Sequence, residues 1–293
     1  MSTRARGVAI AFCTALVSGV SIYLNGKAVK HFGDATVYTT AKNAIAGLLL
    51  LSLALVPARA AQPLRVSKRW PALLALAVVG GSVPFVLFFE GLARAQATQA
   101  SFIQKTLVVW VTLLAVPLLK ERFRAPHALA ICLLLGGQAW YAGSIGHVAF
   151  GEGEAMIFGA TLLWAVEVVY VKRLLGSAAP RALAVARMGL GTVLLLGWLA
   201  ITGRIGQLGS FDTVQWRWVL VSGLLLTAYV ATWYAALARA QAVDVTAVLV
   251  FGVVVTALLS GAHLNLPATA LVSVGTAIVG VLALRPAERA APA

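Results

Sequence analysis

Ten apolar stretches, each about as long as a bilayer is thick, follow one another along this chain with short polar connections between them. A hydrocarbon core of about 30 Å needs about 20 apolar residues per helix. With 61% hydrophobic and 11% charged residues, the chain has more apolar surface than it could bury within itself. We therefore expect an all-α membrane protein with ten transmembrane helices. The predicted spans are Gly7–Asn25, Ala35–Pro57, Trp70–Leu92, Ala97–Leu119, Pro126–Ile145, Gly153–Leu175, Ala182–Thr202, Trp216–Leu237, Ala242–Ala262 and Pro267–Leu284.

Lysine and arginine residues are distributed unequally between the two sides of such a bundle. The side of the N-terminus holds fifteen of them and the other side holds five. Because basic residues gather on the cytoplasmic side, both termini are predicted to be cytoplasmic, in a bacterial-type inner membrane. The basic residues behind the net charge of +14 are then explained as signals that orient the chain in the membrane. Nucleic-acid binding is not expected. The inner set is Arg4, Arg6, Arg59, Arg65, Lys68, Arg69, Lys120, Arg122, Arg124, Lys172, Arg173, Arg181, Arg239, Arg285 and Arg289, and the outer set is Lys27, Lys30, Arg94, Arg204 and Arg217.

The chain repeats itself at half its length. The hexapeptide Leu-Ala-Arg-Ala-Gln-Ala occurs at 92–97 and again at 237–242, 145 residues later. Each half, 1–148 and 149–293, then holds five spans, and this odd number makes the second half enter the membrane from the opposite side. Such inverted repeats build secondary transporters with the substrate site between the halves, near the midplane. Three residues of the first span, Thr14, Leu16 and Tyr23, recur in the sixth at an offset of 147, as Thr161, Leu163 and Tyr170.

Two stretches of the chain resemble motifs of one transporter family. Phe89–Phe123, which ends in Glu121-Arg122, resembles the fourth-helix motif of the drug/metabolite transporter superfamily in its EamA branch. Leu162–Leu175 is similar to the family's sixth-helix Leu-Trp-Ala motif with a following basic pair, and Gly275 and Gly280 occupy its two tenth-helix glycine positions. The resemblance implies ten helices and transport of small metabolites. Within the family, the chain looks most like the aromatic and neutral amino acid exporters.

The chain also departs from the family pattern, and the departures bear on the substrate. Val108 and Val253 stand where the family has mid-helix prolines, Leu266 stands in place of the second-half Glu, and Val17 in place of the first-helix Trp.

Aromatic residues occur where a cavity between the halves is expected. Trp164 lies at the middle of the sixth span, although Trp in membrane proteins is usually placed at the interfaces. Its position in the family motif favours a place in the cavity. Tyr229 and Trp233 are four residues apart and share one face of the eighth span, which predicts an aromatic wall. The alternatives are helix packing or lipid contact for Trp164 and an interfacial belt for the other two.

Charged groups within spans are expensive and are therefore functional candidates. Glu167, one turn beyond Trp164, is a candidate for binding a substrate ammonium or for proton coupling. Lys105 lies on the fourth span in one stripe with Ser101, Gln104 and Val108. This lysine could bind a carboxylate. The alternative interpretation is a purely structural ion pair between Glu167 and Lys105.

Three further charged residues are assigned no function by their spacing. Glu90 is four residues before Arg94, which predicts an exposed ion pair. Lys42 and Arg187 lie close enough to the ends of their spans for their charged heads to reach the membrane surface.

Five residues are candidates for gating. Gly80, Gly81 and Pro84 fall together in the third span, where we predict a hinge at Pro84. Arg94 and Arg239, one in each copy of the hexapeptide, are predicted to lie on opposite sides of the membrane as symmetry-related hinges.

Other classes of function find little support. The chain has no GxxxxGK[ST] run and no HExxH, paired Asp or Ser-Lys arrangement, so neither a built-in ATPase nor an enzyme is expected. No cofactor or metal is expected, since the histidines lack ligand spacing. Amino acids are the predicted small-molecule substrates of a lipid-embedded chain that could act as a monomer. Lipophilic cations, which would need an unpaired carboxylate, and phosphorylated metabolites, which would need convergent basic residues, stay open as alternatives, as does a receptor or scaffold.

Overall fold

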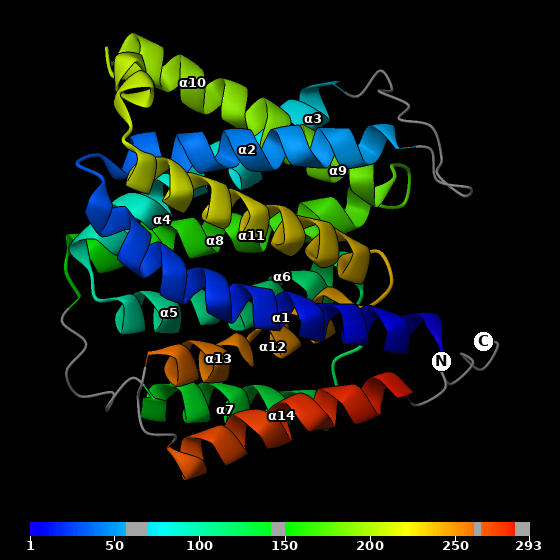
Figure 1. Ribbon diagram of the computed structural model, residues 1–293. Coiled ribbons are helices and arrows are strands. Elements are labelled where there is room, and N and C mark those ends of the chain that lie inside the picture. The colour runs from blue at the N-terminus through cyan, green and yellow to red at the C-terminus, as the bar shows by residue number, and fades with distance from the viewer. Residues whose placement is uncertain (57–69, 142–149, 261–264, 285–293) are drawn as a thin grey trace.

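The chain forms a bundle of long helices that lie side by side and alternate in direction (Figure 1). The computed structural model describes residues 1–56, 70–141, 150–260 and 265–284, and those residues contain helices and no strand. Nine helical segments among them are long and apolar enough to cross a membrane. The remaining predicted span corresponds to α7 (Ala125–Tyr141), of which 17 residues are described. The prediction of an all-helical, multi-pass membrane protein is confirmed.

Several predicted spans are built from more than one helical segment. The segments are α1 (Thr3–Ala28), η1 (Val29–His31), α2 (Ala35–Leu55), α3 (Trp70–Leu76), η2 (Ala77–Ser82), α4 (Val83–Arg94), α5 (Ala97–Lys105), α6 (Leu107–Leu119), α7, α8 (Glu152–Leu174), α9 (Pro180–Val185), η4 (Ala186–Leu190), α10 (Gly191–Ile201), η5 (Ile205–Ser210), α11 (Thr213–Leu237), α12 (Ala242–Leu249), α13 (Gly252–Leu259) and α14 (Leu266–Leu284). Outside the described residues lie the predicted boundary at 148/149, the span ends Pro57, Ile145 and Ala262, and Arg59, Arg65, Lys68, Arg69, Arg285 and Arg289.

The two halves run in opposite directions. Helix α1 begins at the end of the bundle where α14 finishes, which we call the terminal end, whereas α8 begins at the other, distal end (Figure 1). The first helix of each half packs on the third span of the other half, α1 on α11 and α8 on α4. The repeat residues Thr14 and Thr161 are both fully buried and donate to carbonyls four residues earlier, over 3.0 and 2.8 Å.

Both copies of the hexapeptide join a third span to a fourth. In the first copy α4 ends at Arg94 and Gln96 caps α5, and in the second α11 ends at Leu237 and Gln241 caps α12. The first connection lies at the distal end and the second at the terminal end (Figure 1). The same six residues therefore turn the chain on opposite faces of the bundle, as the inverted repeat predicts.

The fourth span of each half is broken at an equivalent place. The first break, at Thr106, separates α5 from α6, and the second, at 250–251, separates α12 from α13. No proline makes either break, since Thr106 stands at the first and Val108 and Val253 stand two residues after the two breaks. At the first break the Thr106 hydroxyl donates to the carbonyl of Ile103 over 2.6 Å, a local bond of the kind that bends helices.

Two spans contain π-helices that pack on each other. Segment η2 interrupts the third span and η4 the seventh. A Cβ on Gly81 would overlap the carbonyl oxygen of Arg187, and one on Gly191 would lie 2.6 Å from the Gly81 carbonyl oxygen. Gly81 and Gly191 therefore allow the two segments to approach each other closely. Extra residues inserted as π-turns are frequent at functional sites.

Candidate functional site

A cavity lies between the two halves of the bundle. Its empty space, with the open mouth included, is about 690 Å³. Its walls come from α1, α2, α4, α5, α6, α8, η4 and α11, so both repeats contribute. The residues that line it are Ser18, Ser21, Ile22, Asn25, Lys42, Phe85, Phe88, Phe89, Gln104, Leu107, Trp164, Glu167, Val168, Arg187, Leu226, Tyr229 and Trp233.

Aromatic rings form much of the wall. The Trp164 ring meets Phe85 edge-on at 5.6 Å between centroids and Phe88 at 5.3 Å. On helix α11, the rings of Tyr229 and Trp233 are stacked, with 5.9 Å between their centroids and 12° between their planes. All three aromatic residues singled out in the sequence line the cavity. They offer flat apolar surfaces against which an aromatic or aliphatic side chain can bury its area.

A buried ion pair lies at the middle of the cavity wall. The Glu167 carboxylate accepts the Tyr234 hydroxyl at Oε1 over 2.7 Å, and its Oε2 lies 3.4 Å from Arg187 Nη2. The side chains of Glu167 and Arg187 are 1% and 4% exposed. Glu167 is therefore paired with Arg187 and not with Lys105, and Arg187 does not reach the membrane surface. The alternative of an ion pair between Glu167 and Lys105 was therefore wrong, because the buried cation beside Glu167 is Arg187.

A backbone carbonyl of the third span helps to hold this arginine. The Gly80 oxygen accepts Arg187 Nε over 3.0 Å and Trp164 Nε1 over 3.4 Å. A Cβ on Gly80 would lie 2.7 Å from the Glu167 side chain. The hinge candidate Gly80 thus positions the charged cluster, whereas Pro84 is buried in α4 outside the cavity lining.

Lys42 is a second buried cation in the cavity. Its ammonium lies 3.7 Å from the centroid of the Phe89 ring and 5.2 Å from that of Phe85, which is cation–π geometry. With 2% of the residue exposed, Lys42 does not reach the membrane surface, contrary to the expectation from its place in the span. The sequence does contain a signal that identifies it: Lys42 and Arg187 are 145 residues apart, the offset of the hexapeptides.

Only part of the polar stripe on the fourth span reaches the cavity. Gln104 lines it, and its buried Oε1 has no hydrogen-bond partner among the described residues. Lys105 lies one layer back, where its ammonium donates to the Ser18 hydroxyl over 3.0 Å. Ser101, whose carbonyl accepts the Gln138 amide, and Val108 are buried in the helix packing outside the cavity lining.

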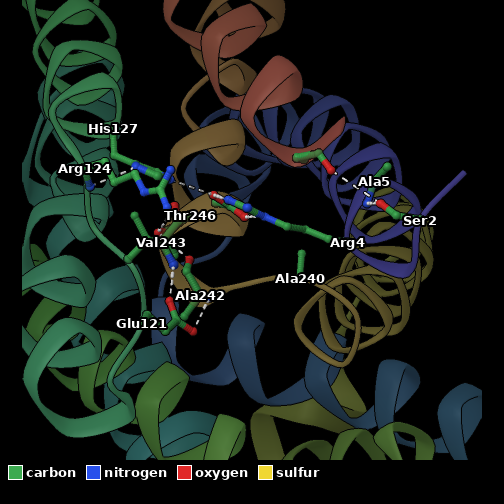
Figure 2. A network of polar contacts seen from close by, with 12 residues as sticks. Ser2, Arg4, Ala5, Glu121, Arg124, His127, Ala240, Ala242, Val243 and Thr246 are labelled. Atoms are coloured by element: carbon green, nitrogen blue, oxygen red, sulfur yellow. Dashed lines mark hydrogen bonds and ion pairs between the residues drawn. The ribbon is translucent and has the colours of Figure 1, made fainter. Parts of the chain in front are cut away.

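The terminal end of the bundle is closed by polar contacts between the halves (Figure 2). Arg4 of α1 binds Asp244 of α12 through two hydrogen bonds of 2.7 and 3.1 Å. His127 of α7 approaches the same carboxylate at 3.6 Å. Glu121, of the family motif, accepts the backbone N–H groups of Ala242 and Val243 over 2.7 and 3.1 Å. A carboxylate from the first half thus caps a helix of the second half.

The cavity extends toward the distal end of the bundle. Ser21 and Asn25 carry the lining into the distal third of α1. At this end Arg204 pairs with Asp34 at 2.9 Å, and the Gln215 amide donates to the His31 carbonyl over 2.9 Å. The lining residues therefore extend from the middle of the bundle toward the distal end, where contacts also join the halves.

The two hexapeptide arginines make equivalent local contacts. Arg94 Nη1 donates to the Glu90 carbonyl over 2.7 Å, and Arg239 Nη1 donates to the Ala235 carbonyl over 2.7 Å. Each therefore caps the end of its own helix. The predicted exposed pair of Glu90 with Arg94 is also present, at 2.6 Å.

Comparisons with known proteins agree with the architecture. One solved structure, described simply as the crystal structure of a protein, matches with a TM-score of 0.75 and 20% identity, over 96% of this chain and 98% of that one. A comparison with curated proteins finds no match. The model of the EamA-like transporter family matches twice, at residues 5–142 and 151–285. These two matches cover both halves of the bundle, and the chain belongs to the EamA-like transporter family, whose members are small-molecule transporters of the drug/metabolite superfamily.

Proposed function

We propose that this transporter exports small metabolites, foremost aromatic and other neutral amino acids, across the bacterial-type inner membrane by alternating access. The observation that carries the proposal is an aromatic-walled cavity between inverted halves, with a buried acid and buried bases on its wall. In this proposal the terminal end faces the cytoplasm, in keeping with the distribution of basic residues.

The cavity offers each part of such a substrate a complementary surface. The side chain would lie against Trp164 and Phe88, where it buries apolar area. The ammonium of Lys42, which has only aromatic neighbours in the described contacts, would take the carboxylate. The substrate ammonium would lie near Glu167 and the unpartnered Oε1 of Gln104.

The charges disfavour one alternative and keep another in the test. A lipophilic cation would need an unpaired carboxylate, but Glu167 is engaged by Arg187 and Tyr234. A phosphorylated metabolite would need convergent basic groups, and Lys42 and Arg187 both line the cavity. A phosphorylated metabolite is therefore the second candidate substrate, after the amino acids.

The test is flux in proteoliposomes that contain the purified full chain. We expect counterflow of labelled phenylalanine and leucine, and little flux of a lipophilic cation or a sugar phosphate. A pH gradient of either sign is applied in parallel to show whether transport is coupled to protons. Absence of flux for every aromatic and branched amino acid would reject the amino acid proposal, and preferred flux of the sugar phosphate would replace it with the second candidate.

Trp164→Ala is expected to raise the KM for phenylalanine by about tenfold or more. The change removes a ring that packs on Phe85 and Phe88, and about 1.4 kcal/mol of lost contact corresponds to a factor of ten. Trp110→Ala is the matched control, because that ring packs on Phe158 and does not line the cavity. Equal changes of KM in the two variants would show that Trp164 is not a binding residue.

Asp244→Asn is expected to loosen the terminal end and shift the population toward the state that opens there. The change keeps the side-chain shape but weakens the paired contact with Arg4. The readout is labelling of a Ser21→Cys reporter by an impermeant maleimide from the distal side, in a chain with Cys13 and Cys132 replaced by Ala. We expect the labelling rate to fall several-fold.

The control for this experiment is Asp212→Asn at the exposed distal cap of α11, which leaves the terminal-end contacts intact. An unchanged labelling rate in Asp244→Asn, or the same decrease in both variants, would contradict a closing role for the Arg4 and Asp244 contact.

A further inference from the structure

Two buried cations lie in corresponding spans of the two inverted repeats. Lys42 lies in the second span of the first half, and Arg187, 145 residues later, lies in the second span of the second half. Both side chains line the cavity, and both lie near one ring: the Lys42 ammonium is 5.2 Å and the Arg187 guanidinium carbon 5.7 Å from the Phe85 centroid. Corresponding spans of the two halves therefore each place one basic group near the same ring on the cavity wall.

Each cation retains hydrogen-bonding capacity that the described residues do not use. Arg187 Nη1 is buried without a hydrogen-bond partner among them, although Nε and Nη2 are engaged by Gly80 and Glu167. The contacts described for the Lys42 ammonium are those with aromatic rings, and no hydrogen bond or ion pair joins it to a described residue. Buried ammonium and guanidinium donors left unpaired are costly, and an anionic group placed between them would satisfy both.

The charges around the cavity point to one negative group on the substrate. Lys42 and Arg187 line the wall and Lys105 lies behind Ser18, while Glu167 is the one carboxylate among the lining residues. A bound carboxylate reduces this positive excess. A substrate ammonium adds to it. A phosphate dianion would approach Glu167, which already lies beside Arg187, and like charges at that range repel.

We propose that Lys42 and Arg187 together form a carboxylate-binding site, and that the transported class is the monocarboxylates with an aromatic or apolar body, for which the carboxylate is required and the ammonium is dispensable. This inference rests on the proposed transport function and narrows its substrate. When the two halves exchange conformations, a carboxylate held between them meets one cation from each half in both states. Neutral amino acids belong to the class, and the same molecules without their amino group belong to it as well.

The experiment is competition with labelled phenylalanine for counterflow in proteoliposomes of the full chain. Three probes share one body: phenylalanine, 3-phenylpropionate, which lacks the ammonium, and phenethylamine, which lacks the carboxylate. We expect phenylpropionate to compete within a few-fold of phenylalanine and phenethylamine to compete at least tenfold more weakly. Phenethylamine competing as well as phenylpropionate would overturn the inference. Sugar phosphate competing more strongly than either acid would overturn it too.

Variants assign the effect to the two cations. Lys42→Gln is expected to weaken competition by phenylpropionate at least tenfold, with partial rescue in Lys42→Arg. Because Arg187→Gln alone leaves Glu167 unpaired and could prevent folding, its effect is measured in the double variant Glu167→Gln, Arg187→Gln, which removes both charges together. Arg217→Gln, on the exposed surface of α11 and outside the cavity lining, is the control and should leave competition unchanged.

The outcomes separate the inference from the proposed function. Phenylalanine flux with unchanged competition in both the Lys42 and the Arg187 variants would overturn the carboxylate-binding site and leave amino acid transport intact. Absence of phenylalanine flux in the wild-type chain would instead reject the proposed function. Direct binding of 3-phenylpropionate to purified wild-type chain, weakened in Lys42→Gln, would still support the binding site in that event.

Discussion

Gly81→Ala is expected to lower the melting temperature of the detergent-purified protein by about 6 °C or more and to abolish transport. A Cβ at this position would overlap the carbonyl oxygen of Arg187 and lie 3.2 Å from the Cα of Gly191. Backbone atoms on a packed helix cannot rotate away as a side chain can, so the π-helices η2 and η4 must separate. Overpacking costs about 3 kcal/mol in such cases, and about 1 kcal/mol corresponds to 2–4 °C in a chain of 150–250 residues.

Gly189→Ala supplies the matched control on the facing π-helix. An added Cβ there meets nothing within 4 Å, and replacing a helical glycine by alanine is neutral or favourable by up to about 1 kcal/mol. We expect an unchanged or slightly raised melting temperature and normal flux. Similar melting temperatures for the Gly81 and Gly189 variants would show that the close contact between η2 and η4 is not required for stability.

The architecture could be predicted from the sequence because a bilayer leaves the chain few choices. Backbone groups in hydrocarbon must bond within their own helix, so length and hydropathy are enough to place the spans. The hexapeptide at 92–97 and 237–242 added the relation between the halves. Because five spans per half is an odd number, the second half must enter the membrane from the side opposite to the first.

The interruptions of the helices could be predicted only in part. Gly80, Gly81 and Pro84 indicated a special place in the third span, but their pattern does not distinguish a kink from a π-helix. The break at Thr106 had no proline to reveal it, and it depends on a hydroxyl that bonds to its own helix. Such local alternatives differ by about 1 kcal/mol, and neighbouring helices decide between them.

The cavity residues were predictable where helical spacing decides and not where helix rotation decides. Helical spacing predicts Trp164 and Glu167 on one face of the sixth span. It likewise predicts Tyr229 and Trp233 on one face of the eighth span. The partner of Glu167 depends on the rotation of η4 relative to α8, and a hydropathy pattern does not determine that rotation. Lys42 and Arg187 were interpreted by their distance from the helix ends, although comparison of the two repeats would have brought them together.

Glu167→Leu is expected to destabilise the protein by about 3–5 kcal/mol, because it leaves the guanidinium of Arg187 buried without a counter-charge. The carboxylate accepts the Tyr234 hydroxyl and pairs with Arg187, and both ionic side chains are at most 4% exposed. Arg94→Gln is the contrasting change, since the Arg94 and Glu90 side chains are 45% and 20% exposed. Removing that pair should cost less than about 1 kcal/mol. Thermal unfolding in detergent measures both.

The double variant Glu167→Leu, Arg187→Met decides whether the pair itself or the stranded charge is responsible. Replacing a buried ion pair by apolar residues of similar volume is often close to neutral, whereas removing one partner is strongly destabilising. We therefore expect the double variant to recover most of the stability lost in Glu167→Leu. Recovery without transport would mean that the charges serve the substrate. A double variant as unstable as Glu167→Leu would instead mean that two bonds stabilise the protein: the bond of Arg187 to Gly80, which joins the halves, and the bond of Tyr234 to Glu167, within the second half.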